Sequence, residues 1–226
     1  MKINLMFVRK NYRPEIISAI NLMCEEFPVL ENIVKVVHVR FLPRYFKRSF
    51  ATAAILGFRK KCIQYEIKLN PYAFSFYGIM FKIFSVEGAN YCSIQDIIIH
   101  EFGHCLQLFI VADKLGIDIL HYKWRKWRKY KELTSEKTKE FYKSFFEDYY
   151  NRFGWSKDDA INHLGTSAVQ NPWESLPECF NNYYRLRLRY PDLTPMELET
   201  YRFTKMVVDE YRSYIPAINK ITNTLS

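Results

Sequence analysis

Apolar residues in the first 92 positions of the chain recur in short, strand-like runs. The clearest run is 63–69, where apolar and polar side chains alternate strictly, so one face of this strand is expected to be buried. Three further strands are expected at 2–8, 34–41 and 51–58, which are rich in β-branched and aromatic residues. Between the first two, Pro14 suits the first turn of a helix that ends at Pro28. The pattern predicts a small mixed sheet with a helix packed on it.

From Ser93 onward the apolar spacing becomes almost wholly helical. Ser93 and Asp96 have the residue types and spacing of a capping box, and residues 97–112 then continue without proline. Two later signals extend this helical half, namely aromatic residues at helical spacing over 142–153 and a cap formed by Thr194, Pro195 and Glu197. We therefore expect an α+β fold in one domain, 1–226, with a sheet-containing part at 1–92 and a helical part at 93–226.

Composition narrows the class of protein. The chain has 226 residues, of which 49% are hydrophobic and only seven are glycine, so it can bury one substantial core and is not low-complexity. Its five cysteines are widely spaced and form no CxxC pair, which argues against a disulfide framework. No signal peptide and no apolar run long enough to span a membrane is seen, so we expect a soluble, cytoplasmic monomer.

The net charge of +9 is compatible with an anionic partner but identifies none. Residues 121–131 contain six basic and four aromatic side chains, a composition suited to nucleic acid or another anionic surface. Leu120, Trp124 and Trp127, however, continue a helical stripe from Ile117. A buried aromatic face with a solvated basic face is therefore the simpler explanation of the segment, and a binding role stays open as the alternative.

The chemistry-bearing motif is His100-Glu101-Phe102-Gly103-His104, an HExxH sequence within the helix that follows Ser93. Residues four apart lie on one face of a helix, so both imidazoles can bind one metal ion while Glu101 lies beside them. Zinc lowers the pKa of bound water towards about 7, and a nearby carboxylate can then take its proton. Gly103 would let another backbone approach this helix closely.

A catalytic zinc site needs a third protein ligand. The histidine-rich extension of the metzincins is absent, since Gln107 and Ile110 occupy its glycine and histidine positions. Further along, Glu174 and Glu178 lie four apart in a segment that leads into an amphipathic helix. We expect Glu174 to complete the ligand set, and Glu178 to accept the hydrogen bond that orients a ligating histidine.

These motifs resemble the gluzincin metallopeptidases, in particular the group that contains the anthrax lethal factor catalytic domain, the Pro-Pro endopeptidases and similar phage-encoded peptidases. The likeness rests on the HExxH motif and on Asn171-x-x-Glu174-x-x-x-Glu178-x-Phe180, and on the order of elements before them. The resemblance implies a zincin-like fold and a Zn²⁺-dependent endopeptidase that acts on a protein or peptide. Its ligands would be His100, His104 and Glu174, and Glu101 would be the general base.

The likeness leaves the donor to the oxyanion unassigned. Ser167 stands where the peptidases of that group have a tyrosine, and His163, Tyr183 or Tyr184 can serve instead only if the fold brings one near.

Pro177 leaves two helix starts open. Either Asn171 caps a helix that kinks at the proline, or Ser175 caps a helix with Pro177 in its first turn and Glu178 completing the box.

An edge strand of the sheet is expected to pair with an extended substrate, and either 51–58 or 63–69 is a candidate, with Glu66 or Lys68 facing the substrate in the second case.

The rival hypothesis is a non-catalytic protein in which zinc only stabilises the fold. Such a protein would use its basic surface to bind nucleic acid or another anionic partner, or would be associated with a virion. For either function, export without a signal peptide stays open.

Overall fold

The computed structural model of the chain describes residues 1–39, 51–59, 62–74, 93–114 and 136–223. Its strands are β1 (Lys2–Asn4), β2 (Val34–Val39), β3 (Ala51–Arg59) and β4 (Cys62–Leu69). The helices of the sheet-containing part are α1 (Arg13–Glu26), α2 (Val29–Ile33) and α3 (Pro71–Phe74). The helical part comprises α5 (Ile94–Lys114), α7 (Glu136–Phe153), α8 (Lys157–Leu164), α9 (Thr166–Gln170), α10 (Pro172–Arg187) and α11 (Pro195–Asn223). The predicted mixed α+β class is confirmed.

The four strands form one sheet in the order β1-β2-β4-β3. β1, β2 and β4 are parallel, and β3 runs antiparallel to β4. In the described part of the sheet β3 and β1 are therefore the two edges, and β4 is central. The buried face predicted for 63–69 is confirmed at Tyr65, Ile67 and Leu69, which lie in the core, although Glu66 between them is buried as well.

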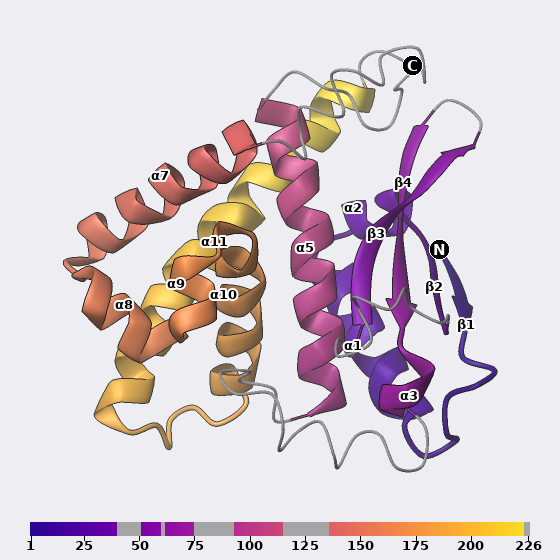
Figure 1. The fold of residues 1–226 in the computed structure, drawn as a ribbon, viewed down its shortest axis with the longest axis horizontal. Helices are drawn as coiled ribbons and strands as arrows, with labels where there is room; N and C mark the ends of the chain where they lie inside the picture. Colours follow the sequence, from indigo (N-terminus) through magenta and orange to yellow (C-terminus); the bar gives the residue numbers. More distant parts are fainter. Residues whose placement is uncertain (40–50, 60–61, 75–92, 115–135, 224–226) are drawn as a thin grey trace.

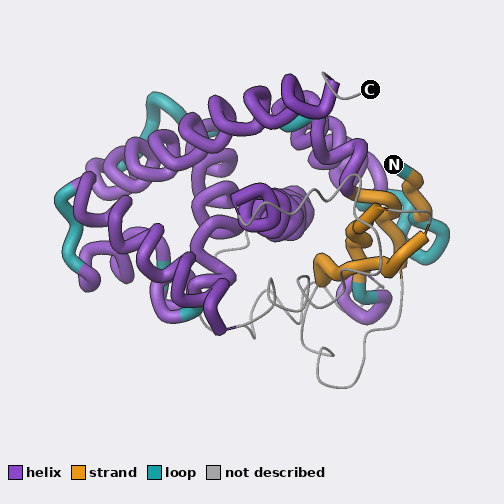
Figure 2. The backbone as a smooth tube through the Cα atoms, turned by 90° about the horizontal axis from the view of Figure 1, so that it is seen from above, coloured by secondary structure: helices purple, strands orange, loops and turns teal. Residues whose placement is uncertain are grey.

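α5 stands between the sheet and the other helices (Figures 1 and 2). It packs against β3 and α1 on one side and against α10 on the other. Among the described helices α5 is long and apolar enough to cross a bilayer, but 83% of that apolar window is buried inside the structure. It therefore has the character of a core helix.

Several elements match their sequence predictions closely. The helix α1 has Pro14 in its first turn and ends before Pro28, and it buries Ile16, Ile20 and Met23. In α7 the aromatic stripe packs inward, with these described side chains buried: Tyr142, Phe146, Tyr149 and Tyr150. The stripe predicted at 117–127 and the basic segment 121–131 lie outside the described residues.

One strand is shorter than its sequence predicts. Residues 2–8 were expected to be a single strand, but β1 ends at Asn4 and a turn follows, closed by a hydrogen bond from the Val8 amide to the Leu5 carbonyl (3.0 Å). The Asn4 side chain accepts a hydrogen bond from the Met6 amide (3.2 Å), which favours the turn over continued pairing. The prediction was wrong because five of these seven residues are apolar, and none of the residues after Asn4 is of a type that usually forms turns.

The start of α11 is held by the predicted cap. The Thr194 amide donates to Glu197 Oε2 (3.0 Å), the Glu197 amide donates to Thr194 Oγ1 (3.3 Å), and Arg189 pairs with the same carboxylate. The hydrogen bond from the Thr194 backbone, aided by Arg189, lowers the pKa of Glu197 from its ordinary value of 4.5 to about 2.

Replacing Glu197 by glutamine should lower the melting temperature near neutral pH, because the neutral amide no longer pairs with Arg189. The folded-state pKa is depressed, so the ionised carboxylate stabilises the fold above its ordinary pKa, and this contribution is lost as pH falls from about 4.5 to about 2. Thermal unfolding of both proteins across this range should show their melting temperatures converging, and a difference independent of pH would contradict the assignment. Glu197→Ala should cost more than Glu197→Gln, because it also removes the cap acceptor.

Candidate metal centre

The helix α5 presents the HExxH residues from a capped start. The Ser93 amide donates to Asp96 Oδ2 (2.8 Å) and the Asp96 amide donates to Ser93 Oγ (3.2 Å), so the predicted capping box is present. Two turns later His100 and His104 lie one above the other, with ring centroids 4.8 Å apart. His100 is buried and His104 is partly exposed, so the pair lies at the border between the core and the surface.

Glu174 approaches both imidazoles from α10. Its Oε2 lies 3.0 Å from His100 Nε2 and 3.6 Å from His104 Nε2. One ligand atom from each of these three residues fits within 4.8 Å, and this is a group of metal-ligating side chains within the described ranges. The structure thus brings together the three residues expected to be ligands.

Glu178 lies one helical turn beyond Glu174 and faces the other ring nitrogen of the same histidine. Its Oε1 is 3.5 Å from His100 Nδ1. The imidazole of His100 therefore has a carboxylate of α10 near each nitrogen, and the contact at Nδ1 has the distance of a close ion pair and is longer than a hydrogen bond. This is the position in which Glu178 can fix the tautomer that leaves Nε2 available to a metal.

A close helix crossing sets this geometry. A Cβ atom added to Gly103 would lie 2.8 Å from the Cα of Pro177, so only glycine fits at this point of α5. Gly103 lies between the two histidines in sequence, and Pro177 lies between the two glutamates. The closest approach of the helices thus occurs where the two pairs face each other.

The α10 helix begins at Pro172, with the Asn171 side chain accepting a hydrogen bond from the Trp173 amide (3.3 Å). Of the two predicted helix starts, the one at Asn171 is therefore correct and the one at Ser175 is wrong. The Ser175 hydroxyl instead donates to the Ala168 carbonyl (2.5 Å) of the preceding short helix. Glu174 consequently lies within the first helical turn and not ahead of the helix.

Two residues that support the site were not singled out from the sequence for this role. Gln107 Nε2 donates to the Pro172 carbonyl (3.2 Å), which fastens the start of α10 to α5. The hydroxyl of Tyr142, from α7, donates to the Gln107 carbonyl (2.6 Å). Gln107 lies seven residues after His100 on the face that carries the histidines, and this helical spacing is the signal that could have found it.

Burial makes two carboxyl groups of this region, those of Glu101 and Glu178, hard to ionise. Burial raises the pKa of Glu101 to about 7, while His104 and the Ala53 backbone act in the opposite direction. Burial, reinforced by the charge of Glu174, also raises the pKa of Glu178 to about 7. Glu101 Oε2 and Glu178 Oε2 are buried and have no hydrogen-bond partner among the described residues.

The histidines and Glu174 behave as a coupled group. Burial lowers the pKa of His100 to about 4, so its ring is neutral near pH 7, which is the form that binds metal. Burial alone would raise the pKa of Glu174, but hydrogen bonds with His100 and His104 hold it well below its ordinary value. For His104, burial acts to lower the pKa, but the hydrogen bond and charge of Glu174 outweigh it and raise the pKa. The site therefore combines an ionised carboxylate with a neutral imidazole at His100.

None of the predicted replacements for the missing tyrosine makes a described contact with this group. His163 stacks on Trp155, with ring centroids 4.3 Å apart, and its Nδ1 is 2.8 Å from Thr200 Oγ1. Tyr183 accepts a hydrogen bond from Arg212 (3.4 Å), and Tyr184 interacts with Arg212 and Glu26.

Comparisons of the chain with protein-family models, with curated proteins and with solved structures found no match. The likeness to zinc peptidases therefore rests on the residues and their arrangement.

Replacing Gly103 by alanine should destabilise the protein, although alanine is the better helix former by about 1 kcal/mol. The added methyl group meets the backbone of Pro177, so α5 and α10 must separate, at a net cost of about 1–3 kcal/mol. Denaturant unfolding measures this cost, and the same variant should bind Zn²⁺ at least about tenfold more weakly.

Gly154→Ala is the control for this prediction. A Cβ at Gly154 meets no atom within 4 Å, although its φ of +80° strains any substitution, so stability falls while zinc affinity is unchanged. Unchanged zinc affinity in Gly103→Ala would show that the helix crossing does not set the site.

Proposed function

We propose that this protein is a zinc-dependent endopeptidase of the zincin-like class. The observation that carries the proposal is the convergence of His100, His104 and Glu174 on one point, with Glu101 adjacent to His100 on the same helix. Two imidazoles and one carboxylate are a donor set typical of catalytic zinc sites, which keep one position open.

The residues present fit a divalent cation. Glu101, Glu174 and Glu178 bring three carboxyl groups close to two imidazoles in a largely buried region, and two of the carboxylate oxygens have no hydrogen-bond partner among the described residues. Buried polar groups without partners destabilise a fold, and a cation at the His100–His104–Glu174 group would offset the negative charge. Mixed nitrogen and oxygen donors favour zinc over calcium or magnesium.

Each side chain then has a distinct role. Zinc, when bound, supplies a Lewis acid that polarises a carbonyl and lowers the pKa of water. The Glu101 carboxylate accepts the proton of the attacking water and returns it to the departing amine. Glu178 acts on His100 Nδ1 and so positions a ligand without contacting substrate.

The sheet supports the expected mode of substrate binding. The described sheet has β3 at its edge, and the backbone of Ala53 on this strand hydrogen-bonds Glu101. The alternative edge, 63–69, is wrong because that strand lies between β2 and β3, and its Glu66 pairs with His38 and Lys68. We infer that an extended peptide pairs with β3 and so lies next to Glu101.

The rival function, a zinc-stapled binding protein, draws on the charge distribution. Residues 40–50, 60–61 and 115–135 together contain 12 of the 33 basic side chains and 2 of the 24 acidic ones. The net charge of +9 is thus concentrated in three short stretches of sequence, as would suit an anionic partner.

The purified full chain should bind about one equivalent of Zn²⁺, and removal of zinc should lower its melting temperature. His100→Ala, His104→Ala and Glu174→Ala should each abolish tight binding, and Glu178→Gln should weaken it about 10- to 100-fold. His163→Ala is the matched control, because this histidine packs on Trp155 and has no described contact with the group. Titration calorimetry measures these affinities, and full-strength binding by the His100 or His104 variant would contradict the assigned site.

A diverse peptide library separates the two functions. The zinc-loaded protein should cleave members of the library, and Glu101→Gln should retain zinc while losing about 10²- to 10⁴-fold in rate. Full cleavage by Glu101→Gln would refute the mechanism. Zinc binding that stabilises the fold without any cleavage, together with salt-dependent retention on nucleic acid, would favour the zinc-stapled binding protein.

A further inference from the structure

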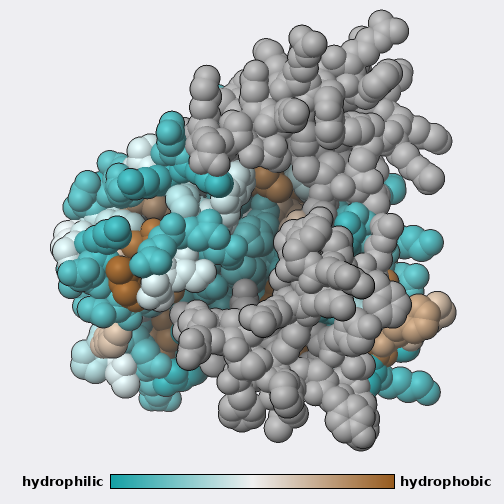
Figure 3. Space-filling model, viewed as in Figure 1, coloured by the Kyte–Doolittle hydropathy of each residue, from teal (hydrophilic) through white to brown (hydrophobic). Residues whose placement is uncertain are grey.

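The loop between β1 and α1 displays two bulky apolar side chains to solvent. Met6 and Phe7 are 66% and 67% exposed, although they are adjacent in sequence and follow a strand of the sheet. Figure 3 shows a hydrophobic projection at the right edge of the molecule, where Figure 1 draws this loop. The loop lies on the side of the sheet away from α10 and the candidate metal centre (Figure 1).

The turn that carries these side chains is firmly held. Leu5 and Val8, which precede and follow them, are buried in the core, and the Val8 amide bonds the Leu5 carbonyl (3.0 Å). From the start of α1, Arg13 donates to the Met6 carbonyl (3.1 Å) and to the Val8 carbonyl (3.0 Å). The outward direction of Met6 and Phe7 is thus imposed by the backbone.

The central positions of a tight turn normally carry glycine, proline, asparagine, aspartate or serine. Met6 and Phe7 have none of the properties that favour a turn, and their exposure costs hydrophobic free energy. The Leu5–Val8 turn would form more readily with small polar residues at these two positions. A contact outside the chain would recover the apolar area left exposed.

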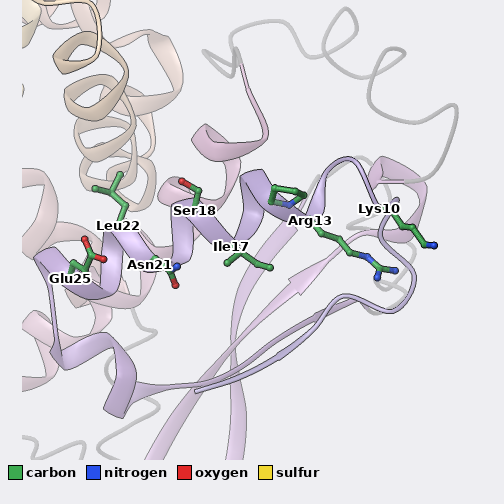
Figure 4. A pocket seen from close by; sticks show the side chains of 8 residues that line it. Lys10, Arg13, Ile17, Ser18, Asn21, Leu22 and Glu25 are labelled. Carbon is green, nitrogen blue, oxygen red and sulfur yellow. The ribbon is translucent and has the colours of Figure 1, made fainter.

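Basic residues flank this apolar tip in the sequence. Residues 1–14 contain four basic side chains and no acidic one: Lys2, Arg9, Lys10 and Arg13. Lys10 and Arg13 also line one end of a groove of about 690 Å³ that continues along α1 past Ile17 to Glu25 (Figure 4). Ile17, in that groove, is a further exposed apolar side chain on the same helix.

We propose that the tip formed by Met6 and Phe7 inserts into the interface of an anionic lipid membrane, while the exposed side chains of Lys2 and Lys10 contact the lipid headgroups. A protruding tip of two side chains is far smaller than the roughly 1,000 Å² that a specific protein interface needs. A lipid interface requires no complementary shape. Insertion of apolar side chains and each basic residue near an anionic surface both make the free energy of membrane binding more favourable. This surface is independent of the metal centre and goes beyond the proposed peptidase function.

Co-sedimentation of the full chain with lipid vesicles tests the proposal. The wild type should bind vesicles of phosphatidylcholine with about 30% phosphatidylserine much more tightly than vesicles of phosphatidylcholine alone. Binding should weaken as salt rises from about 0.1 M to about 0.5 M. The double variant Met6→Ser, Phe7→Ser leaves every charge in place and puts a turn-forming residue at both sites, and it should lose at least about tenfold in partition.

A matched control uses apolar side chains exposed elsewhere. Leu188→Ser, Met196→Ser removes residues that are 80% and 52% exposed near the junction of α10 and α11, and it should bind the vesicles as the wild type does. Lys2→Gln, Lys10→Gln should weaken binding only to the vesicles that contain phosphatidylserine. Unchanged melting temperatures for the serine variants establish that the fold is intact.

Three results would overturn the proposal. The first is equal vesicle binding by the wild type and the Met6→Ser, Phe7→Ser variant. The second is equal loss in the Leu188→Ser, Met196→Ser control. The third is a dimer, seen by sedimentation velocity without lipid and abolished by the Met6→Ser, Phe7→Ser variant, which would assign the tip to a second copy of the chain.

Discussion

The contact between Gly103 of α5 and Pro177 of α10 is the constraint on which the candidate centre depends. A methyl group at Gly103 would lie 2.8 Å from the Cα of Pro177, so the two backbones are as close as they can be. His100 and His104 lie on either side of Gly103 in the sequence, and Glu174 and Glu178 lie on either side of Pro177. The close crossing therefore brings the two pairs opposite each other. The short distances from Glu174 and Glu178 to His100 follow from it. Without this contact, α5 would still carry a complete HExxH sequence but would lack the third ligand.

The arrangement of the side chains on α5 could be predicted because it depends on local rules. The capping box at Ser93, the four-residue spacing of the histidines and the absence of a side chain at Gly103 are all set within one helix. The approach of Glu174 depends on a tertiary contact 70 residues further along the chain. Sequence spacing could propose Glu174 as a ligand, but it could not choose between the two helix starts around Pro177. That choice is made by the Asn171 cap and by the hydrogen bond from Gln107 to Pro172, which joins residues 65 apart.

Most strands of the sheet could be predicted from the sequence, but the order in which they pair could not. The strict alternation at 63–69 identified a strand with one buried face, but periodicity does not say which neighbour a strand acquires. Two strands were therefore equal candidates for the edge until the pairing of β4 with both β2 and β3 separated them. The prediction of a single strand over 2–8 was wrong for a different reason. Its apolar composition at Met6 and Phe7 is typical of a buried strand, while the structure places both side chains in solvent.

The position of Glu101 bears on the choice between a catalytic centre and a structural staple. A staple between α5 and α10 needs only His100, His104 and Glu174 as ligands, and Glu101 on the side of β3 would not be one of them. Burial raises the pKa of Glu101 to about 7, so this carboxylate is desolvated at a cost in stability, and its Oε2 has no hydrogen-bond partner among the described residues. The backbone of Ala53 hydrogen-bonds Glu101, so the carboxylate also joins α5 to β3. The proposed hydrolase function uses an acid at this position to move a proton beside the three ligands, and a staple has no such use for it.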